Sequence, residues 1–328
     1  MNKPSISTND IAPAKSAPGH GQQPPVPEPE LLADADQIIR WAIREDMGPE
    51  GNDITSGMAI PADINSTAHI VARQAGTPAG LFLLERIAAQ YGPGISVRLH
   101  YPDGGEVNAG TKIAELTGPA QAILAAERVM LNFLGRLSGI ATLTHAYVAA
   151  VRQACPAEKS RPAVCDTRKT TPGWRRLEKY AVRCGGGTNH RMGLYDGVML
   201  KDNHLAALAR QLGPDRTLAD LTMHVRRQTP PRIPVWLEVD TLAQLAAALP
   251  GGADIILLDN MCAADMAKAV RIRNAASGAK PLLEASGGIS LSTIGDAARS
   301  GVDRISIGSL THSAPWLDIS MDFAMEHE

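Results

Sequence analysis

Residues 163–204 read AVCDTRKTTPGWRRLEKYAVRCGGGTNHRMGLYDGVMLKDNH, a succession of strand, loop, helix, Gly-rich loop and strand. Their cationic side chains follow the short apolar runs AVC and GVML and are not spread along one helical face. A solvated basic surface would scatter its charges among acidic residues on helices, whereas strand-like runs bounded by turn residues indicate a site at the strand ends. The cations that we predict to converge on one anionic ligand are Arg168, Lys169, His190, Arg191 and Lys201.

The same strand pattern continues through the C-terminal half. The candidate strands are 163–166, 197–201, 235–239, 254–259, 281–286 and 304–309. A loop follows each one and in most cases an amphipathic helix, which favours parallel β–α units. Six visible strands with one more nearby predict an α/β barrel. An open doubly wound sheet is the alternative, but no GxGxxG loop follows a strand.

The N-terminal part has a different pattern. Residues 1–30 are rich in Pro, Ala, Ser and Gly and are expected to be disordered. A helix from Leu31 to the stop at Gly48 is followed by residues 53–56, which lead into a run of strands, and this order predicts an α/β domain over 31–130. Residues 121–155 are helical, with an expected break near Ser138 and Gly139, and 131–310 form the barrel domain.

Composition restricts the class of protein. A chain of 328 residues, 44% hydrophobic and 20% charged, can bury one large core or two moderate ones. A net charge of −2 gives no general attraction to nucleic acid or to an anionic membrane. Four cysteines without a CxxC pair, no apolar run of ~20 residues and no signal segment predict a cytoplasmic protein with reduced thiols.

In barrels of this kind the active site lies where the strands end, so the residues after each strand are the candidates. Glu238 and Asp259 end apolar strands and suit Mg²⁺ or sugar hydroxyls, and the amides of ASGG and IGS suit a phosphate. The full set at the strand ends is Arg168, Lys169, Lys201, Glu238, Asp240, Asp259, Asn260, Ser286, Gly287, Gly288 and Gly308.

Six motifs carry a resemblance to a known family. They are ERVMLNFLGRLSGIAT, DTRKTTPGWR, CGGGTNHRMGLYDGVMLKDNH, LEVD, ILLDNM and EASGGI. In order, from about residue 35 to the C-terminus, they resemble the quinolinate phosphoribosyltransferases, pentosyltransferases of de novo NAD synthesis. The resemblance implies an N-terminal α/β sandwich and an incomplete, seven-stranded α/β barrel. It also implies a last helix, about 311–328, that returns to the first domain.

The resemblance also implies a reaction. Quinolinate and phosphoribosyl pyrophosphate would give nicotinate mononucleotide, pyrophosphate and CO2, with Mg²⁺ and no organic cofactor. The enzyme would be a homodimer or a hexamer in which a neighbouring subunit supplies Arg128. The residues that would bind quinolinate are Arg128, Arg168, His190 and Arg191.

The second substrate has its own implied contacts. Lys169 and Lys201 would neutralise pyrophosphate, and Glu238 and Asp259 would hold the ribose and, directly or indirectly, Mg²⁺. These four are the implied catalytic residues. The implied contacts of the 5′-phosphate are Ser286, Gly287, Gly288 and Gly308.

Simpler interpretations stay open for single residues. Arg168 and Lys169 can be a surface pair, His190 a structural histidine, and Glu238 or Asp259 a partner of Lys169 or Lys201 in an internal ion pair. Trp174 stands where the family motif usually has Leu, and a bulky ring there can alter the packing of the loop.

Other functions are alternatives for the whole chain. A relative associated with molybdenum uptake shares the implied fold but lacks the full DTRKTTPG and GGGTNHR motifs. A lyase would use Lys169 or Lys201 as a Schiff-base nucleophile. A sensor of phosphate ligands would bind without turnover.

Overall fold

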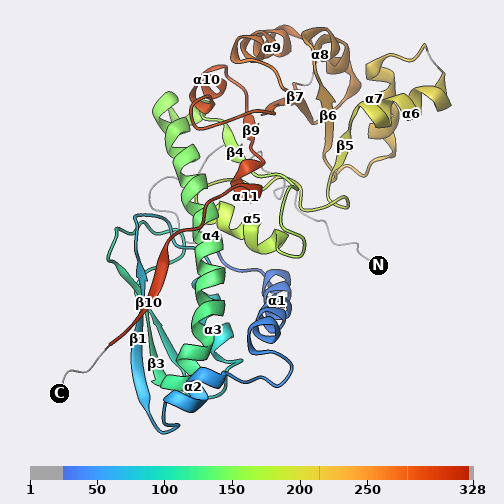
Figure 1. Cartoon of the computed structure of the whole chain (residues 1–328). Helices are drawn as coiled ribbons and strands as arrows, with labels where there is room; N and C mark the ends of the chain where they lie inside the picture. Colours follow the sequence, from blue (N-terminus) through green and yellow to red (C-terminus); the bar gives the residue numbers. More distant parts are fainter. Residues whose placement is uncertain (1–24, 214, 279, 325–328) are drawn as a thin grey trace, which may run out of the picture. The chain divides into compact units, whose positions relative to one another are not determined.

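The computed structural model describes residues 25–213, 215–278 and 280–324, which form two compact units (Figure 1). The barrel unit comprises Tyr147–Arg168 and Thr188–Ile307. The sandwich unit comprises 25–146, Lys169–Gly187 and 308–324. Within the described residues the chain passes from one unit to the other after residues 146, 168, 187 and 307. Of the predicted disordered segment, residues 1–24 lie outside the described residues, and Pro29 already begins a helix.

The barrel unit is built on one parallel sheet in the order β4-β9-β8-β7-β6-β5. Its strands are β4 (Ala163–Cys165), β5 (Val198–Leu200), β6 (Val235–Val239), β7 (Ile255–Asp259), β8 (Leu282–Ser286) and β9 (Arg304–Ser306). All six predicted strands are confirmed. A single parallel bridge between Cys165 and Thr188 extends the sheet on the free side of β4, at the place of the seventh strand.

Helices alternate with these strands, as the repeated pattern predicts. They are α6 (Asp202–Leu212), α7 (Leu218–Gln228), α8 (Leu242–Ala248), α9 (Ala263–Ala275) and α10 (Ile294–Arg299). The interior is aliphatic, since Leu237, Ile256 and Leu283 are fully buried on three neighbouring strands. Apolar burial of this kind is the main contribution to stability. Because the strands are parallel, the polar residues that follow them lie at one edge of the sheet.

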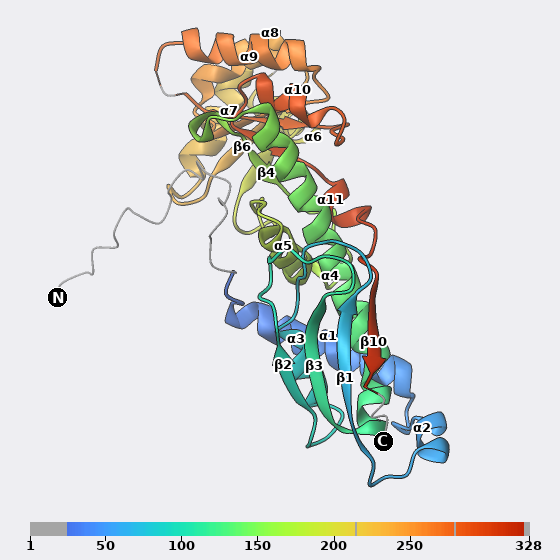
Figure 2. The ribbon, with the colours of Figure 1, turned by 90° about the vertical axis from the view of Figure 1, so that its left-hand side faces the viewer.

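The sandwich unit contains an antiparallel sheet in the order β10-β1-β3-β2 (Figure 2). Its strands are β1 (Asn65–Ala72), β2 (Ser96–Leu99), β3 (Lys112–Pro119) and β10 (Ile319–Phe323). The helices of this unit are α1 (Pro29–Met47), α2 (Ile54–Ala59), α3 (Leu83–Ala88), α5 (Arg175–Cys184) and α11 (Ser309–His312). In the residues that the structure describes, every helix is too short or too polar to cross a membrane.

The predicted C-terminal helix over 311–328 is wrong. Helix α11 ends at His312, Pro315 follows, and β10 pairs antiparallel with β1, with Ile70 opposite Met321. Proline cannot continue a helix, and the strand covers an edge of β1 that would otherwise expose unpaired backbone groups.

Between the first helix and β1, residues 54–59 form helix α2, which was not predicted. Asp53 caps its first turn by accepting the Ser56 amide at 3.1 Å. One further expectation is corrected. Helix α4 (Ala120–Ala154) is continuous, without a break near Ser138 and Gly139. There the Ser138 hydroxyl accepts the Ala79 amide at 3.0 Å, and the C-terminal segment packs on Gly139, where an added Cβ would lie 2.0 Å from the Pro315 oxygen.

We predict that Gly139→Ala destabilises the protein. The added methyl would force α4 away from Pro315, at a cost of about 1–3 kcal/mol in the free energy of unfolding. Gly57→Ala is the matched control, because a Cβ at this helical glycine meets nothing within 4 Å. It should stabilise the protein by about 0.5–1 kcal/mol. Urea unfolding of both variants measures the difference, and equal effects would contradict the close packing at Gly139.

Candidate functional site

The strand ends of the barrel unit gather the predicted polar residues on one side of the sheet. Lys201 follows β5, Glu238 lies in β6, and their side chains form an ion pair. This is the ion pair with a lysine that the sequence allowed as the simpler interpretation of Glu238. Both side chains keep access to water, Lys201 at 44% and Glu238 at 16% exposure, so an incoming ligand can exchange for either partner.

The loops after β7 and β8 are fitted to one another. Asp259 and Ser286 stand opposite each other in the register, and the Asn260 amide donates to the Ser286 carbonyl at 2.8 Å. Asn260 has a φ of 53°, and its side-chain amide donates to Asp259 Oδ2 at 2.7 Å. A Cβ on Gly287 would lie 2.1 Å from Asn260 Oδ1.

Positive φ angles of 88° at Gly287 and 61° at Gly288 bend the backbone after β8. Glycine adopts such angles without strain, and the absence of a Cβ lets a ligand approach the amides. The structure therefore brings Asp259, Ser286 and the two glycines together, as predicted from the strand ends.

Arg168 and Arg191 are brought close to one another. Arg191 is half-buried, and its Nη1 donates to the Gly197 carbonyl at 2.7 Å. Burial lowers the pKa of Arg191, and the charge of Arg168 lowers it further. The charge of Asp196 opposes this shift. Guanidinium groups gathered at the ends of barrel strands suit the binding of an anionic ligand.

His190 lies in a buried polar cluster. Its Nδ1 accepts the Arg191 amide at 2.7 Å, so the ring proton is on Nε2, which faces Glu284 Oε1 at 3.2 Å. The ring stacks on Trp236 with centroids 4.8 Å apart. Arg304 Nε donates to the other Glu284 oxygen at 2.8 Å.

Asp166 completes this cluster from the end of β4. It accepts the His190 amide at 2.8 Å and the Asn189 side chain at 2.6 Å. Asp166, Glu284 and Arg304 were not predicted as site residues from the sequence. Asp166 and Glu284 belong to the motifs DTRK and EASGG, in which only the cations, the serine and the glycines were taken as ligand contacts.

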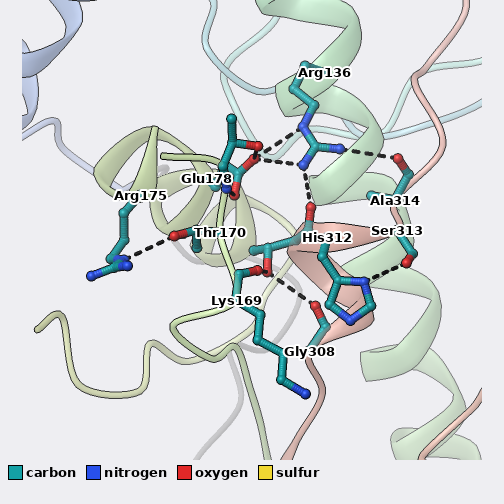
Figure 3. Close-up of polar contacts among 11 residues, drawn as sticks. Arg136, Lys169, Thr170, Arg175, Glu178, Gly308, His312, Ser313 and Ala314 are labelled. Carbon is teal, nitrogen blue, oxygen red and sulfur yellow. Dashed lines mark hydrogen bonds and ion pairs between the residues drawn. The ribbon is translucent and has the colours of Figure 1, made fainter. Parts of the chain in front are cut away.

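Three predicted residues belong to the sandwich unit. Lys169 is exposed, and Thr311 Oγ1 donates to its carbonyl at 2.7 Å (Figure 3). A Cβ on Gly308 would lie 3.1 Å from Lys169 Cδ and 3.2 Å from His312 Nε2. Arg128 is exposed on α4 and lines a cavity of about 560 Å³ with Arg136, Thr171, Trp174, His312 and Trp316 among others.

Two further residues of the quoted stretch 163–204 make local contacts. His204 Nδ1 accepts the Lys201 amide at 3.1 Å and so caps α6. Trp174 stacks on Phe133 of α4, with centroids 4.8 Å apart and an interplanar angle of 19°. The larger ring at position 174 thus packs within the sandwich unit and removes no charge.

Comparisons with known proteins agree over nearly the whole chain. The family model described as quinolinate phosphoribosyl transferase, C-terminal domain, matches residues 140–322, and the model of the N-terminal domain matches 53–138. The probable nicotinate-nucleotide pyrophosphorylase [carboxylating] of Bacillus subtilis is 41% identical over 89% of this chain and 94% of its own. The Mycobacterium leprae nicotinate-nucleotide pyrophosphorylase [carboxylating] is 39% identical over 88% of this chain and 96% of its own.

Solved structures give the same result. The nicotinate-nucleotide pyrophosphorylase from Francisella tularensis superposes with a TM-score of 0.80 at 33% identity, over 92% of this chain and 98% of that one. Such similarity over both units supports the predicted fold of a sandwich followed by a barrel.

We predict that Glu284→Gln changes the acid stability of the protein. Burial would raise the pKa of Glu284, but His190 and Arg304 together lower it to about 2, from an ordinary 4.5. A lowered pKa means that the carboxylate stabilises the fold above pH 4.5 and that this stabilisation is lost as the pH falls toward 2.

The variant should therefore be less stable than the parent chain at pH 7 by roughly 3 kcal/mol, and the difference should shrink between pH 4.5 and pH 2. Urea unfolding at several pH values measures it. Asp265→Asn, which removes an exposed carboxylate paired with Lys268, should have little effect. A Glu284→Gln deficit that stays constant across this range would refute the assignment.

Proposed function

The chain belongs to the quinolinate phosphoribosyl transferase family, and on this premise we propose that it performs the family's reaction in NAD biosynthesis. It transfers the phosphoribosyl group of phosphoribosyl pyrophosphate to the ring nitrogen of quinolinate. The products are nicotinate mononucleotide, pyrophosphate and CO2. Relatives named quinolinate phosphoribosyltransferase [decarboxylating], such as that of Nicotiana tabacum at 37% identity over 88% of this chain, support this activity.

The observation that carries the proposal is the match of both family domain models, over 53–138 and 140–322. Arg168 and Arg191, in the loops at the barrel strand ends, suit the substrate that the family name gives. Quinolinate has two carboxylates, and a guanidinium group binds a carboxylate through two parallel hydrogen bonds. We assign both arginines to the dicarboxylate. His190, whose ring nitrogens face the Arg191 amide and Glu284, is assigned to the same site as the residue that holds the Arg191 backbone in place.

The second substrate is assigned to the remaining residues. Glu238 and Asp259 accept hydrogen bonds from the ribose hydroxyls, and Lys169 and Lys201 neutralise the pyrophosphate. The backbone amides of Ser286, Gly287 and Gly288, with Gly308, bind the 5′-phosphate. In the absence of substrate the Lys201–Glu238 pair satisfies both charges, so binding exchanges one set of ion pairs for another.

Mg²⁺ is proposed to accompany phosphoribosyl pyrophosphate. No three His, Cys, Asp or Glu side chains within the described residues are grouped to hold a metal by themselves. Glu238 and Asp259 end neighbouring parallel strands, and Mg²⁺ is commonly held by one or two carboxylates together with substrate phosphates. The ion would neutralise charge on the leaving group.

Catalysis then follows from positioning and charge. The ring nitrogen attacks the anomeric carbon as the bond to pyrophosphate breaks, and the lysines stabilise the negative charge that develops on the leaving oxygen. The new pyridinium nitrogen lies beside the 2-carboxylate and accepts the electron pair when this group leaves as CO2. The chemistry of decarboxylation is therefore supplied by the substrate.

We further propose a cytoplasmic homodimer in which Arg128 completes the site of the neighbouring subunit. Arg128 is exposed on α4, so its guanidinium is accessible to a partner. The described cysteines are all free thiols, which accords with a reducing compartment.

The direct test is incubation with quinolinate, phosphoribosyl pyrophosphate and Mg²⁺. We expect equal amounts of nicotinate mononucleotide, pyrophosphate and CO2, measured by chromatography and gas release. Borohydride treatment with a carbonyl substrate should trap no covalent adduct, because the lysines bind anions and form no Schiff base. Trapping without nucleotide formation would favour a lyase, and binding without turnover would favour a sensor.

A shared site predicts complementation. Arg128→Ala and Arg191→Ala chains should each be inactive, whereas a mixed dimer regains one site that has both arginines. Random exchange of subunits restores about a quarter of the sites. Activity measured after mixing and refolding tests this, with each variant refolded alone as the control, and no recovery would argue against a shared arginine.

A further inference from the structure

A buried ion pair in the sandwich unit connects two segments that carry predicted substrate contacts (Figure 3). Arg136 lies on α4 and Glu178 on α5. Arg136 Nη2 is 2.7 Å and Nε 3.2 Å from Glu178 Oε1. The Glu178 side chain is fully buried, and that of Arg136 is 14% exposed.

The two partners bind different segments. Glu178 accepts the Thr171 amide at 3.1 Å and the Thr171 hydroxyl at 2.8 Å, and so fixes the segment that begins at Lys169. Arg136 donates to the carbonyls of Thr311 and Ala314, and so fixes the segment that begins at Gly308. The ion pair is thus one link between the two segments, in addition to the direct hydrogen bond from Thr311 to Lys169.

Lys169 and Gly308 are adjacent as a result. Thr311 Oγ1 donates to the Lys169 carbonyl at 2.7 Å, and a Cβ on Gly308 would touch Lys169 Cδ at 3.1 Å. A shift of either segment would therefore move the Lys169 ammonium group relative to the Gly308 amide. Both are assigned above to phosphoribosyl pyrophosphate.

The choice of residue types argues for a role beyond stability. A buried ion pair costs desolvation that its attraction often only just offsets, so an apolar pair would stabilise these helices as well. A planar guanidinium has five donors in a rigid arrangement. Arg136 uses them to reach one carboxylate and two carbonyls at once, which the single ammonium group of lysine does not reproduce.

We propose that Arg136 and Glu178 are positioning residues for phosphoribosyl pyrophosphate. They hold the segments of Lys169 and Gly308 in register and contact no substrate themselves. This inference rests on the proposed function for the identity of the ligand. The geometric part, that the pair sets a polyphosphate site at Lys169 and Gly308, is tested independently of turnover.

Steady-state kinetics of Arg136→Lys provide the first test. The KM for phosphoribosyl pyrophosphate should rise by about 10- to 100-fold, because a small misplacement of binding groups has effects of this size. The KM for quinolinate should rise by a clearly smaller factor, since Arg191 lies in the barrel unit and is held there by His190 and Gly197. Glu178→Gln keeps an acceptor for Thr171 and should lie between the parent chain and Glu178→Ala.

Arg86→Lys is the matched control. Arg86 also forms a two-bonded pair in the sandwich unit, with Asp36 at 2.8 and 2.6 Å, and binds neither segment. The Arg86→Lys variant should have a lower melting temperature than the parent chain and unchanged KM values for both substrates. An Arg136→Lys chain that loses thermal stability but keeps its KM for phosphoribosyl pyrophosphate would overturn the proposal, as would an equal rise in both KM values.

Calorimetric titration with inorganic pyrophosphate tests the positioning role of Arg136 and Glu178 separately from the proposed function. Arg136→Lys and Glu178→Gln should weaken pyrophosphate binding by similar factors relative to the parent chain, with Arg86→Lys unaffected. A parent chain that binds pyrophosphate but forms no nicotinate mononucleotide refutes the proposed function and leaves the positioning role standing. Unchanged pyrophosphate binding in both variants refutes the positioning role. If Arg136→Lys does not fold, Glu178→Gln decides alone.

Discussion

A carboxylate removed from water must be neutralised where it lies, and each unit of this chain contains a glutamate under that constraint. Glu178 in the sandwich unit and Glu284 in the barrel unit are both fully buried. Each is paired with an arginine, Arg136 or Arg304. Because an unpaired charge in the interior is very costly, these pairs leave little freedom in the segments to which they are bonded.

Those segments carry cations that we assign to the proposed site. Glu178 bonds to Thr171, two residues after Lys169, and Glu284 faces His190, which holds the backbone of Arg191. Each buried carboxylate therefore restrains the segment of one cation within its own unit. In the proposed site this restraint is preorganisation in the electrostatic sense.

Much of this arrangement could be predicted from the sequence. The six parallel strands have apolar runs bounded by turn residues, and parallel strands end at a common edge. Residues such as Asp259, Ser286 and Gly287 were therefore predictable neighbours.

The partners of buried charges were not predictable, because Glu284 and Arg304 meet only through the register of β8 and β9. Gly139 was interpreted as a helix break, although its lack of a Cβ serves a contact with Pro315, 176 positions later. The helix over 311–328 was taken from the family resemblance, and the pairing of β10 with β1 is a tertiary interaction without a local signal that could have corrected it.

That pairing has a consequence for how the sandwich unit folds. Strand β10 lies far from β1 in the sequence, and contacts such as Arg73 with Asp322 join residues 249 positions apart. Contacts of such long sequence separation form slowly. Until β10 pairs with it, β1 presents an open edge to other chains, so a variant that weakens this pairing would be inclined to aggregate.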